Sequence, residues 1–388
     1  MKQIKLSLVA LVAIGTLSHL SAESSLEETL KKAVENIKIS GFTRTKYNIS
    51  KTDGANTGEV LRLSGQLNVV SKVYDDLFFG TTLAADGNNF PSHDPSSPIA
   101  GYTASNNKGL YVDRFYLKYL INDFELIGGK YDITSPWTET GFNSSRGNGL
   151  SVLYKGIKDW TFAGLTFLQT NGFDDTNYGV DLGSHHNYYA TGVTGSFKDA
   201  GLDLQLWTGI YEKTMEVMIY TDVRYSFNGF GIRAQANYAK LDKDFAISNN
   251  IESQEGLYYG LELRYNVNDL FYVKGEYTKN DKDQPFYTFD GDNGGFLTSG
   301  EYETLNAPNA ARYSVSIGKN FNDLRLEGSY YELDRDGDIK KLNGGSVEAG
   351  YKYGNFIANL ELTYKQRTVA NGQKKGIKGA ELELIYWF

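Results

Sequence analysis

The stretch "GEVLRLSGQLNVV", residues 58–70, alternates between apolar and polar side chains. In an extended chain one face carries Leu61, Leu63, Gly65, Leu67 and Val69, and the other carries Arg62, Ser64, Gln66 and Asn68. Successive side chains of a β-strand point to opposite faces, so this period of two predicts a strand with one apolar face and one polar face.

The same period continues from Lys38 to the end of the chain. Counting the alternating runs predicts eighteen strands, at approximately 38–49, 58–71, 77–86, 110–121, 123–131, 149–156, 159–169, 188–197, 201–212, 215–227, 230–241, 256–267, 270–279, 310–320, 324–333, 345–353, 355–365 and 379–388. The sequence therefore indicates an all-β protein.

The connections between these runs alternate between two kinds. Eight are tight turns rich in Asp, Asn and Gly, residues that supply the side-chain hydrogen bonds and positive φ that turns require: near 74, 121, 156, 198, 228, 267, 321 and 353. Eight of the others are long and polar, at 50–57, 87–109, 132–148, 170–187, 242–255, 280–309, 334–344 and 366–378, and a ninth is a short tip near Lys213. Eighteen antiparallel strands with both termini at one end require eight turns and nine opposite connections.

A water-soluble sandwich also has period-two strands, but its two ends do not differ systematically. Here long loops gather at one end and short turns at the other, and Tyr and Phe concentrate near strand ends. Both features are typical of transmembrane antiparallel β-barrels of the bacterial outer membrane, with short periplasmic turns and long extracellular loops.

The last residues, "ELELIYWF", read as the closing strand. We expect Ala380, Leu382, Leu384, Tyr386 and Phe388 to face lipid, and Glu381, Glu383, Ile385 and Trp387 to face inward or toward the rim. An unpaired strand edge is prohibitive in lipid, so strand eighteen must pair with strand one near residues 39–49.

The first residues predict export. Lys2 and Lys5 precede an apolar run too short to span a bilayer, as in a signal peptide of residues 1–22; cleavage after Ala22 and cleavage after Ser24 both remain open. Residues 23–37 then place apolar side chains at helical spacing, which predicts a short amphipathic helix. Residues 38–388 form the barrel.

Composition excludes several classes. Removing Lys2 and Lys5 from 39 basic residues leaves 37 against 47 acidic ones, a charge of about −10, which argues against nucleic acid as a partner. There are no cysteines, so no disulfide framework or cysteine metal site forms. Past the leader no run of 18 apolar residues occurs, which excludes transmembrane helices.

Two stretches narrow the interpretation further: "LEETLKKAVENIKISGFTR" at 26–44 and "GGKYDITSPWTETGF" at 128–142. They resemble the opening and the third-loop region of the major outer membrane porins of campylobacter-type bacteria. The resemblance implies an eighteen-stranded homotrimeric porin with a mild cation preference. The terminal strand also resembles the signal read by the barrel assembly machinery, with Tyr386 and Phe388 as its aromatic residues.

The connection at 132–148 is the candidate pore constriction, because the corresponding loop of trimeric porins folds into the barrel and the resemblance suggests the same here. Its charges are Asp132, Glu139 and Arg146. Facing a basic wall, these charges would set a transverse field across the narrowest point. Candidate wall residues are Arg44, Lys46, Arg62, Arg114 and Lys118, with Glu125 among their acidic counterparts.

Further lumen carboxylates are expected at Asp222, Glu262, Glu276, Glu327, Glu348 and Glu361. Each of them alone is better explained as a solvated charge paired with a neighbour across the ladder. As a set they indicate a water-filled interior, since a barrel that only packed its core would not keep so many.

Other functions have weaker support. A catalytic site would need a positioned base, and the one local cluster is His185 with Asp175 or Asp181 in a predicted loop. We expect no enzyme activity and no cofactor. "DRDGD" at 334–338 begins like a calcium loop but has Gly345 where the motif requires Glu. The acidic loop with Asp281, Asp283, Asp290 and Asp292 leaves Ca²⁺ binding, or Ca²⁺ bridging to surface lipopolysaccharide, open.

The sequence thus predicts a passive outer-membrane porin for small hydrophilic solutes and ions. A substrate-selective channel is the alternative within the same architecture. An adhesin or structural barrel whose long loops matter more than conductance is the alternative from another class.

Overall fold

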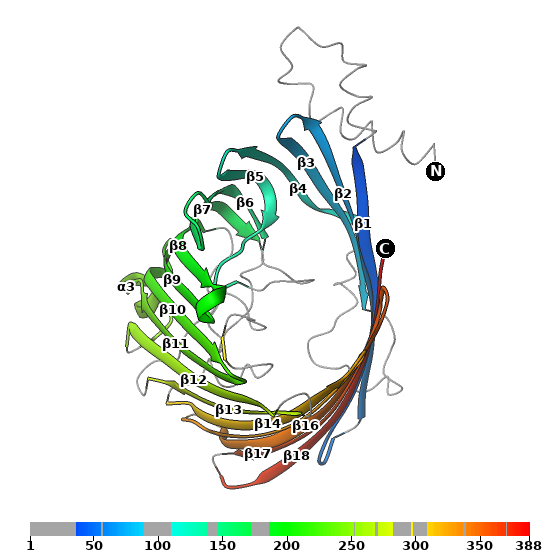
Figure 1. The fold of residues 1–388 in the computed structure, drawn as a ribbon. Helices are drawn as coiled ribbons and strands as arrows, with labels where there is room; N and C mark the ends of the chain where they lie inside the picture. Colours follow the sequence, from blue (N-terminus) through cyan, green and yellow to red (C-terminus); the bar gives the residue numbers. More distant parts are fainter. Residues whose placement is uncertain are drawn as a thin grey trace.

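Eighteen antiparallel strands close into one ring in the computed structural model (Figure 1). The structure describes residues 36–55, 57–88, 110–138, 146–171, 186–251, 253–267, 271–281, 296–297, 309–336, 339–369 and 371–388. Each strand pairs with its sequence neighbours, and β1 also pairs with β18. This is the predicted fold, a closed antiparallel barrel.

The strands follow the sequence in order. Their bounds are β1 Ile37–Thr52, β2 Thr57–Tyr74, β3 Leu77–Asn88, β4 Leu110–Ile121, β5 Phe124–Asp132, β6 Arg146–Tyr154, β7 Trp160–Asn171, β8 Tyr188–Phe197, β9 Leu202–Tyr211, β10 Met215–Phe227, β11 Phe230–Leu241, β12 Glu255–Val267, β13 Phe271–Asn280, β14 Ala311–Phe321, β15 Leu324–Asp334, β16 Ile339–Tyr353, β17 Phe356–Val369 and β18 Lys374–Trp387.

The seam between β1 and β18 is closed to the last residue. The register runs from Phe42 opposite Trp387 to Thr52 opposite Ile377. Beyond it, the Gly41 N–H donates to the Phe388 carbonyl and the Phe388 N–H donates to the Gly41 carbonyl, both at 3.0 Å. The chain therefore ends on a residue whose backbone is needed to complete the ring.

The tight turns lie at one end of the barrel, here called the turn end. Asn122, Asn228 and Asn322 have φ of 49°, 47° and 50°, and Gly229 and Gly354 have φ of 83° and 55°. These left-handed conformations are those that Asn and Gly adopt most easily. The Asn and Gly residues that predicted these turns from the sequence thus adopt the backbone conformations that the turns require.

The two faces of the wall divide as the period predicts. Leu261, Leu263 and Tyr265 on β12 point outward and are 42%, 53% and 41% exposed. Between them, Glu262 and Arg264 face inward, in register with Glu276 and Lys274 of β13. Apolar side chains cover the outside and charged ones line the inside, the reverse of a soluble domain.

Three predicted boundaries are corrected. β16 begins at Ile339 rather than 345, and β18 at Lys374 rather than 379, so both hairpins extend farther at the loop end. In these extensions lysines stand on both faces, at 340 and 341 and at 374 and 375, which hides the alternation. Ile37 opens β1 instead of ending a helix. Residues 23–35 of that predicted helix, and the signal peptide, lie outside the described residues.

Helices are few in the described part of the chain. The helix α3 (Lys243–Ser248) sits between β11 and β12, and its N-cap Asp242 accepts hydrogen bonds from the Asp244 and Phe245 N–H groups. The short 3-10 helix η2 (Lys198–Ala200) forms a turn between β8 and β9. Among the described residues, no helix has both the length and the apolar character needed to cross a membrane.

Candidate functional site

The connection after β5 turns into the ring of strands (Figure 1). Its shape is set locally: the Ser135 N–H donates to Thr138 Oγ1 at 3.0 Å, and Thr138 Oγ1 donates to the Ile133 carbonyl at 2.6 Å. This turn presents Trp137, which is fully buried and donates its Nε1–H to Asn237 Oδ1 on β11 at 2.6 Å. Residues 133–138 are therefore fastened to the inner wall, one hundred positions away in sequence.

A second connection, the one between β13 and β14, also reaches the inside. Its residues Phe296–Leu297 form the short yellow piece within the ring in Figure 1. The Phe296 ring lies 5.3 Å from both the Tyr220 and the Tyr258 rings. The Leu297 N–H donates to Gln235 Oε1 at 3.0 Å. Both inner segments thus bind β11, at the alternate inward positions 235 and 237.

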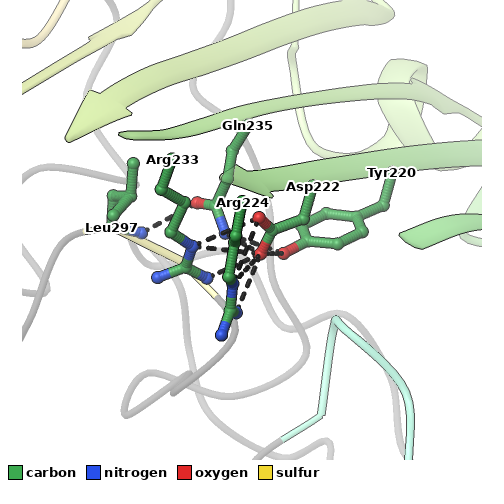
Figure 2. A network of polar contacts seen from close by, with 6 residues as sticks. All are labelled: Tyr220, Asp222, Arg224, Arg233, Gln235 and Leu297. Carbon is green, nitrogen blue, oxygen red and sulfur yellow. Dashed lines mark hydrogen bonds and ion pairs between the residues drawn. The ribbon is translucent and has the colours of Figure 1, made fainter. Parts of the chain in front are cut away.

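A buried carboxylate, that of Asp222, lies next to Gln235, as Figure 2 shows. Asp222 on β10 is 1% exposed and lies 2.9 Å from Arg224 Nη2 and 2.8 Å from Arg233 Nη2. Gln235 Nε2 donates to Asp222 and to the Tyr220 hydroxyl, both at 2.8 Å. One glutamine therefore joins the charged cluster to the backbone of Leu297.

The charge pattern on β4 depends on a bulge. Thr82 pairs with Arg114 and Leu83 with Val112, so Asp113 is the extra residue. A bulge turns two adjacent side chains to one face. Here it directs both Asp113 and Arg114 to the inside, where Arg114 Nε lies 2.6 Å from Asp132 Oδ1 and Arg146 Nε lies 3.0 Å from Asp113 Oδ2.

Other inward cations also have carboxylate partners. Arg44 Nε lies 2.5 Å from Glu383 Oε1, and Lys46 Nζ lies 2.7 Å from Glu381 Oε1, across the seam. Glu125 binds Lys118 at 2.6 Å and Lys155 at 3.1 Å. The inner wall thus carries charges of both signs, and most of the side chains named here form ion pairs.

The family model described as "Campylobacter major outer membrane protein" matches residues 1–328 of the 388. The chain belongs to the Campylobacter major outer membrane protein family. It is an outer-membrane porin of a Gram-negative bacterium. Comparison with curated proteins gave no match.

Solved structures share the fold of this porin. The OpdK structure with vanillate, from Pseudomonas aeruginosa, is 12% identical, with a TM-score of 0.71 over 91% of this chain and 99% of that one. OccK5 (OpdH) of the same organism is 14% identical, with a TM-score of 0.69 over 91% and 98%. OccK2 (OpdF) in complex with glucuronate is 12% identical, with a TM-score of 0.70 over the same shares.

The bounds expected for the porin's third loop need correction. Asp132 is the last residue of β5 and Arg146 the first of β6, and the two are paired in the ladder. Asp132 Oδ1 lies 2.6 Å from Arg114 and 3.4 Å from Arg146, so it binds its own side of the wall. The two arginines attract it from the neighbouring strands on either side, Arg114 on β4 and Arg146 on β6. Glu139, the third expected charge, lies outside the described residues.

The expected wall residues are all on inward positions. Arg62 lies directly opposite Lys46, and Glu125 is shared by two lysines. Of the expected acidic counterparts, Glu276 binds Lys274 at 2.9 Å and Arg312 at 3.4 Å, and Glu327 binds Arg325 at 2.5 Å. Glu262 lies opposite Glu276.

The alternatives to a porin gain little from the described residues. His93, His185, Asp175 and Asp181 lie outside them, as do Asp283, Asp290 and Asp292. Asp334 ends β15, 3.9 Å from Lys341 Nζ. In the part of the chain that the structure describes, no three His, Cys, Asp or Glu side chains are grouped to hold a metal ion.

Several residues escaped sequence reasoning. For Trp137 the sequence offers one clue, which is that a large aromatic residue stands in an otherwise polar loop. Phe296 and Gln235 carried no local signal, because their importance comes from contacts between distant segments. Asp113 was hidden by the bulge, which breaks the period at that point. Arg224 and Arg233 lie on neighbouring strands, and only the register between those strands brings both to one carboxylate.

Proposed function

We propose that this porin is a passive channel for small hydrophilic solutes and ions, narrowed by its third loop and mildly selective for cations. The observation that carries this proposal is the anchoring of Trp137 on Asn237 inside a ring of charged side chains. A loop held across a water-filled lumen limits the size of what passes, and fixed charges close to the path set the preferred sign. No reaction is part of this function.

We further propose that the chain loses its signal peptide, is inserted by the barrel assembly machinery through its terminal aromatic strand, and forms a homotrimer among outer-membrane lipid and lipopolysaccharide. Support comes from the amino-terminal sequence, the completed seam at Phe388 and the family relationship.

Purified protein in a planar bilayer tests the channel. We expect stepwise open-channel conductance with steps in multiples of three, and a K⁺-to-Cl⁻ permeability ratio above one in a salt gradient. A silent bilayer contradicts the channel, and current carried mostly by chloride contradicts the cation preference. Single steps in place of triplets contradict only the trimer.

A substrate-selective channel is the second candidate, because of a cavity of about 530 Å³ beside the third loop. It is lined by aromatic side chains, among them Tyr116 and Tyr131, and by two ion pairs, Arg114 with Asp132 and Lys118 with Glu125. Aromatic and charged groups together suit a small polar solute with an aromatic or sugar ring. Vanillate and glucuronate, which two of the fold relatives bind in their structures, are suitable probes. Saturable block of the ion current by either one favours this candidate, and unaltered current favours the general porin.

A further inference from the structure

We infer that cations cross the barrel along the wall formed by β15–β18, where a row of four glutamates sets the charge preference of the channel proposed above. The row is Glu327, Glu348, Glu361 and Glu381, one from each of the four strands. Two independent features lead to it: the side of the lumen that the inner loop segments occupy, and the register that aligns the four carboxylates.

The described loop segments inside the barrel pack on β9–β12. Trp137 lies over β11 through Asn237 and over β10 through Tyr220, whose ring centroid is 6.4 Å from its own. Phe296 fills the space between Tyr220 and Tyr258. Together with Met218 and Ala239 these side chains form a buried apolar cluster. An apolar cluster of this kind excludes water and ions from that part of the lumen.

Another part of the wall, from β13 to β18, borders a second cavity, of about 600 Å³. Its lining has small hydroxyl side chains in register, Ser316 opposite Ser329, Ser329 opposite Ser346 and Ser346 opposite Thr363. Short side chains leave space in the lumen next to these strands. Their hydroxyl groups can take the place of water molecules around a passing ion or solute. A wide hydrated strip therefore runs beside the filled region.

The four glutamates stand next to this strip. Glu327 is directly opposite Glu348, Glu348 opposite Glu361, and Glu361 opposite Glu381. Like charges directly opposite one another destabilise a sheet, so this arrangement opposes stability rather than serving it. All four glutamates line the same cavity.

Cations offset part of the row: Lys46 Nζ lies 2.7 Å from Glu381 Oε1. Arg325 Nη2 is shared, 2.5 Å from Glu327 Oε2 and 3.7 Å from Glu348 Oε2. The side chain of Glu348 is 42% exposed and that of Glu381 is 32% exposed, so their charge acts on the water of the cavity. On the filled side, in contrast, Asp222 is 1% exposed and the half-exposed neighbour is Arg224. The residues that line the cavity include five glutamates, Glu276 and the four of the row, against the two cations Arg312 and Lys365, so the charge on the strip is predominantly negative.

The test compares charge removal on the two walls, in the full-length porin in planar bilayers at low salt. Glu348→Gln and the double variant Glu348→Gln/Glu361→Gln remove charge from the row. Asp203→Asn is the matched control: Asp203 is an exposed carboxylate on β9, in register with Arg224. One charge at about 8 Å in water changes the local concentration of a monovalent ion about twofold. Because removing the charge lowers local K⁺ and raises local Cl⁻ by the same factor, we expect the K⁺-to-Cl⁻ permeability ratio to fall about fourfold per glutamate removed and to change less in the control.

A labelling experiment locates the path independently. The chain has no cysteine, so Ser346→Cys and the buried control Ala239→Cys can each be exposed to a cationic methanethiosulfonate reagent. Labelling at 346 should lower the current, and residue 239 should not react. Equal permeability ratios for the glutamate variants and Asp203→Asn, or unaltered current after labelling at 346, overturn this inference while the channel stands. A wild-type protein that never conducts overturns the channel itself, and the row with it.

Discussion

At the residue scale, Gly41 shows how closely the seam is fitted. A Cβ at this position would lie 2.2 Å from the Gln66 carbonyl oxygen and 2.7 Å from Phe388 Cζ. The backbone oxygen cannot move without breaking the β1–β2 ladder, and the ring belongs to the last residue of the chain. Only glycine lets both neighbours approach at once.

Gly41→Ala is therefore expected to lower the yield of folded barrel and to destabilise what folds by about 1–3 kcal/mol, the usual cost of overpacking. The measurement is the folded fraction in a urea titration, read from heat-modifiable mobility on a gel. Gly164→Ala is the matched control, because a Cβ there meets no atom within 4 Å. Equal stability of the two variants would show that the seam tolerates a side chain.

The residue scale also sets the limit of sequence reasoning. Period two placed Arg44, Lys46 and Glu383 on the inward face, and the structure pairs them across the seam. It did not reveal that Arg114 and Arg146 share the carboxylates of Asp113 and Asp132, because a bulge has no simple signature in one sequence. The side of the sheet to which a side chain points follows from the local sequence. The side chain that it pairs with depends on the register between neighbouring strands.

At the element scale, the strands were predictable and the loop paths were not. Alternation and turn chemistry located every strand, with the largest errors at the starts of β16 and β18, where polar residues on both faces mask the period. The descent of residues 133–138 into the lumen followed only from the family resemblance. Its anchor on β11, and the second anchor of Leu297 on the same strand, arise from contacts that no local pattern encodes.

The anchor of the third loop gives a prediction at this scale. Trp137→Phe keeps an aromatic ring but loses the Nε1–H donor, and Asn237→Ala removes the acceptor. Each should weaken the docking by about 1–3 kcal/mol, since the partner left behind is a buried unsatisfied polar group. We expect noisier single-channel current with openings to a larger conductance.

The double variant Trp137→Phe/Asn237→Ala should resemble the single variants, because all three lack the same hydrogen bond. Asn266→Ala on β12 serves as a control at an inward position away from this loop contact. Strictly additive effects of the two substitutions would mean that the residues act separately and that this bond does not hold the loop.

At the scale of the whole molecule, different faces of the barrel stabilise the fold in lipid and select the solutes that pass. The outward face is apolar and the ring has no free edge, which suits a lipid environment where every backbone group must be paired. The inward face carries the charges, and two connections are folded onto one side of it. The ring thus supplies a fixed frame, while size and charge discrimination depend on a few side chains inside it.

Passive diffusion limited by size is the central claim, and swelling of proteoliposomes in isotonic sugar solutions tests it most directly. Liposomes that contain the porin should swell fastest in a pentose, more slowly in a disaccharide and least in a tetrasaccharide, without saturation as the sugar concentration rises. Liposomes without protein are the control. Absence of swelling in every sugar, despite correctly folded barrel in the membrane, would contradict the account.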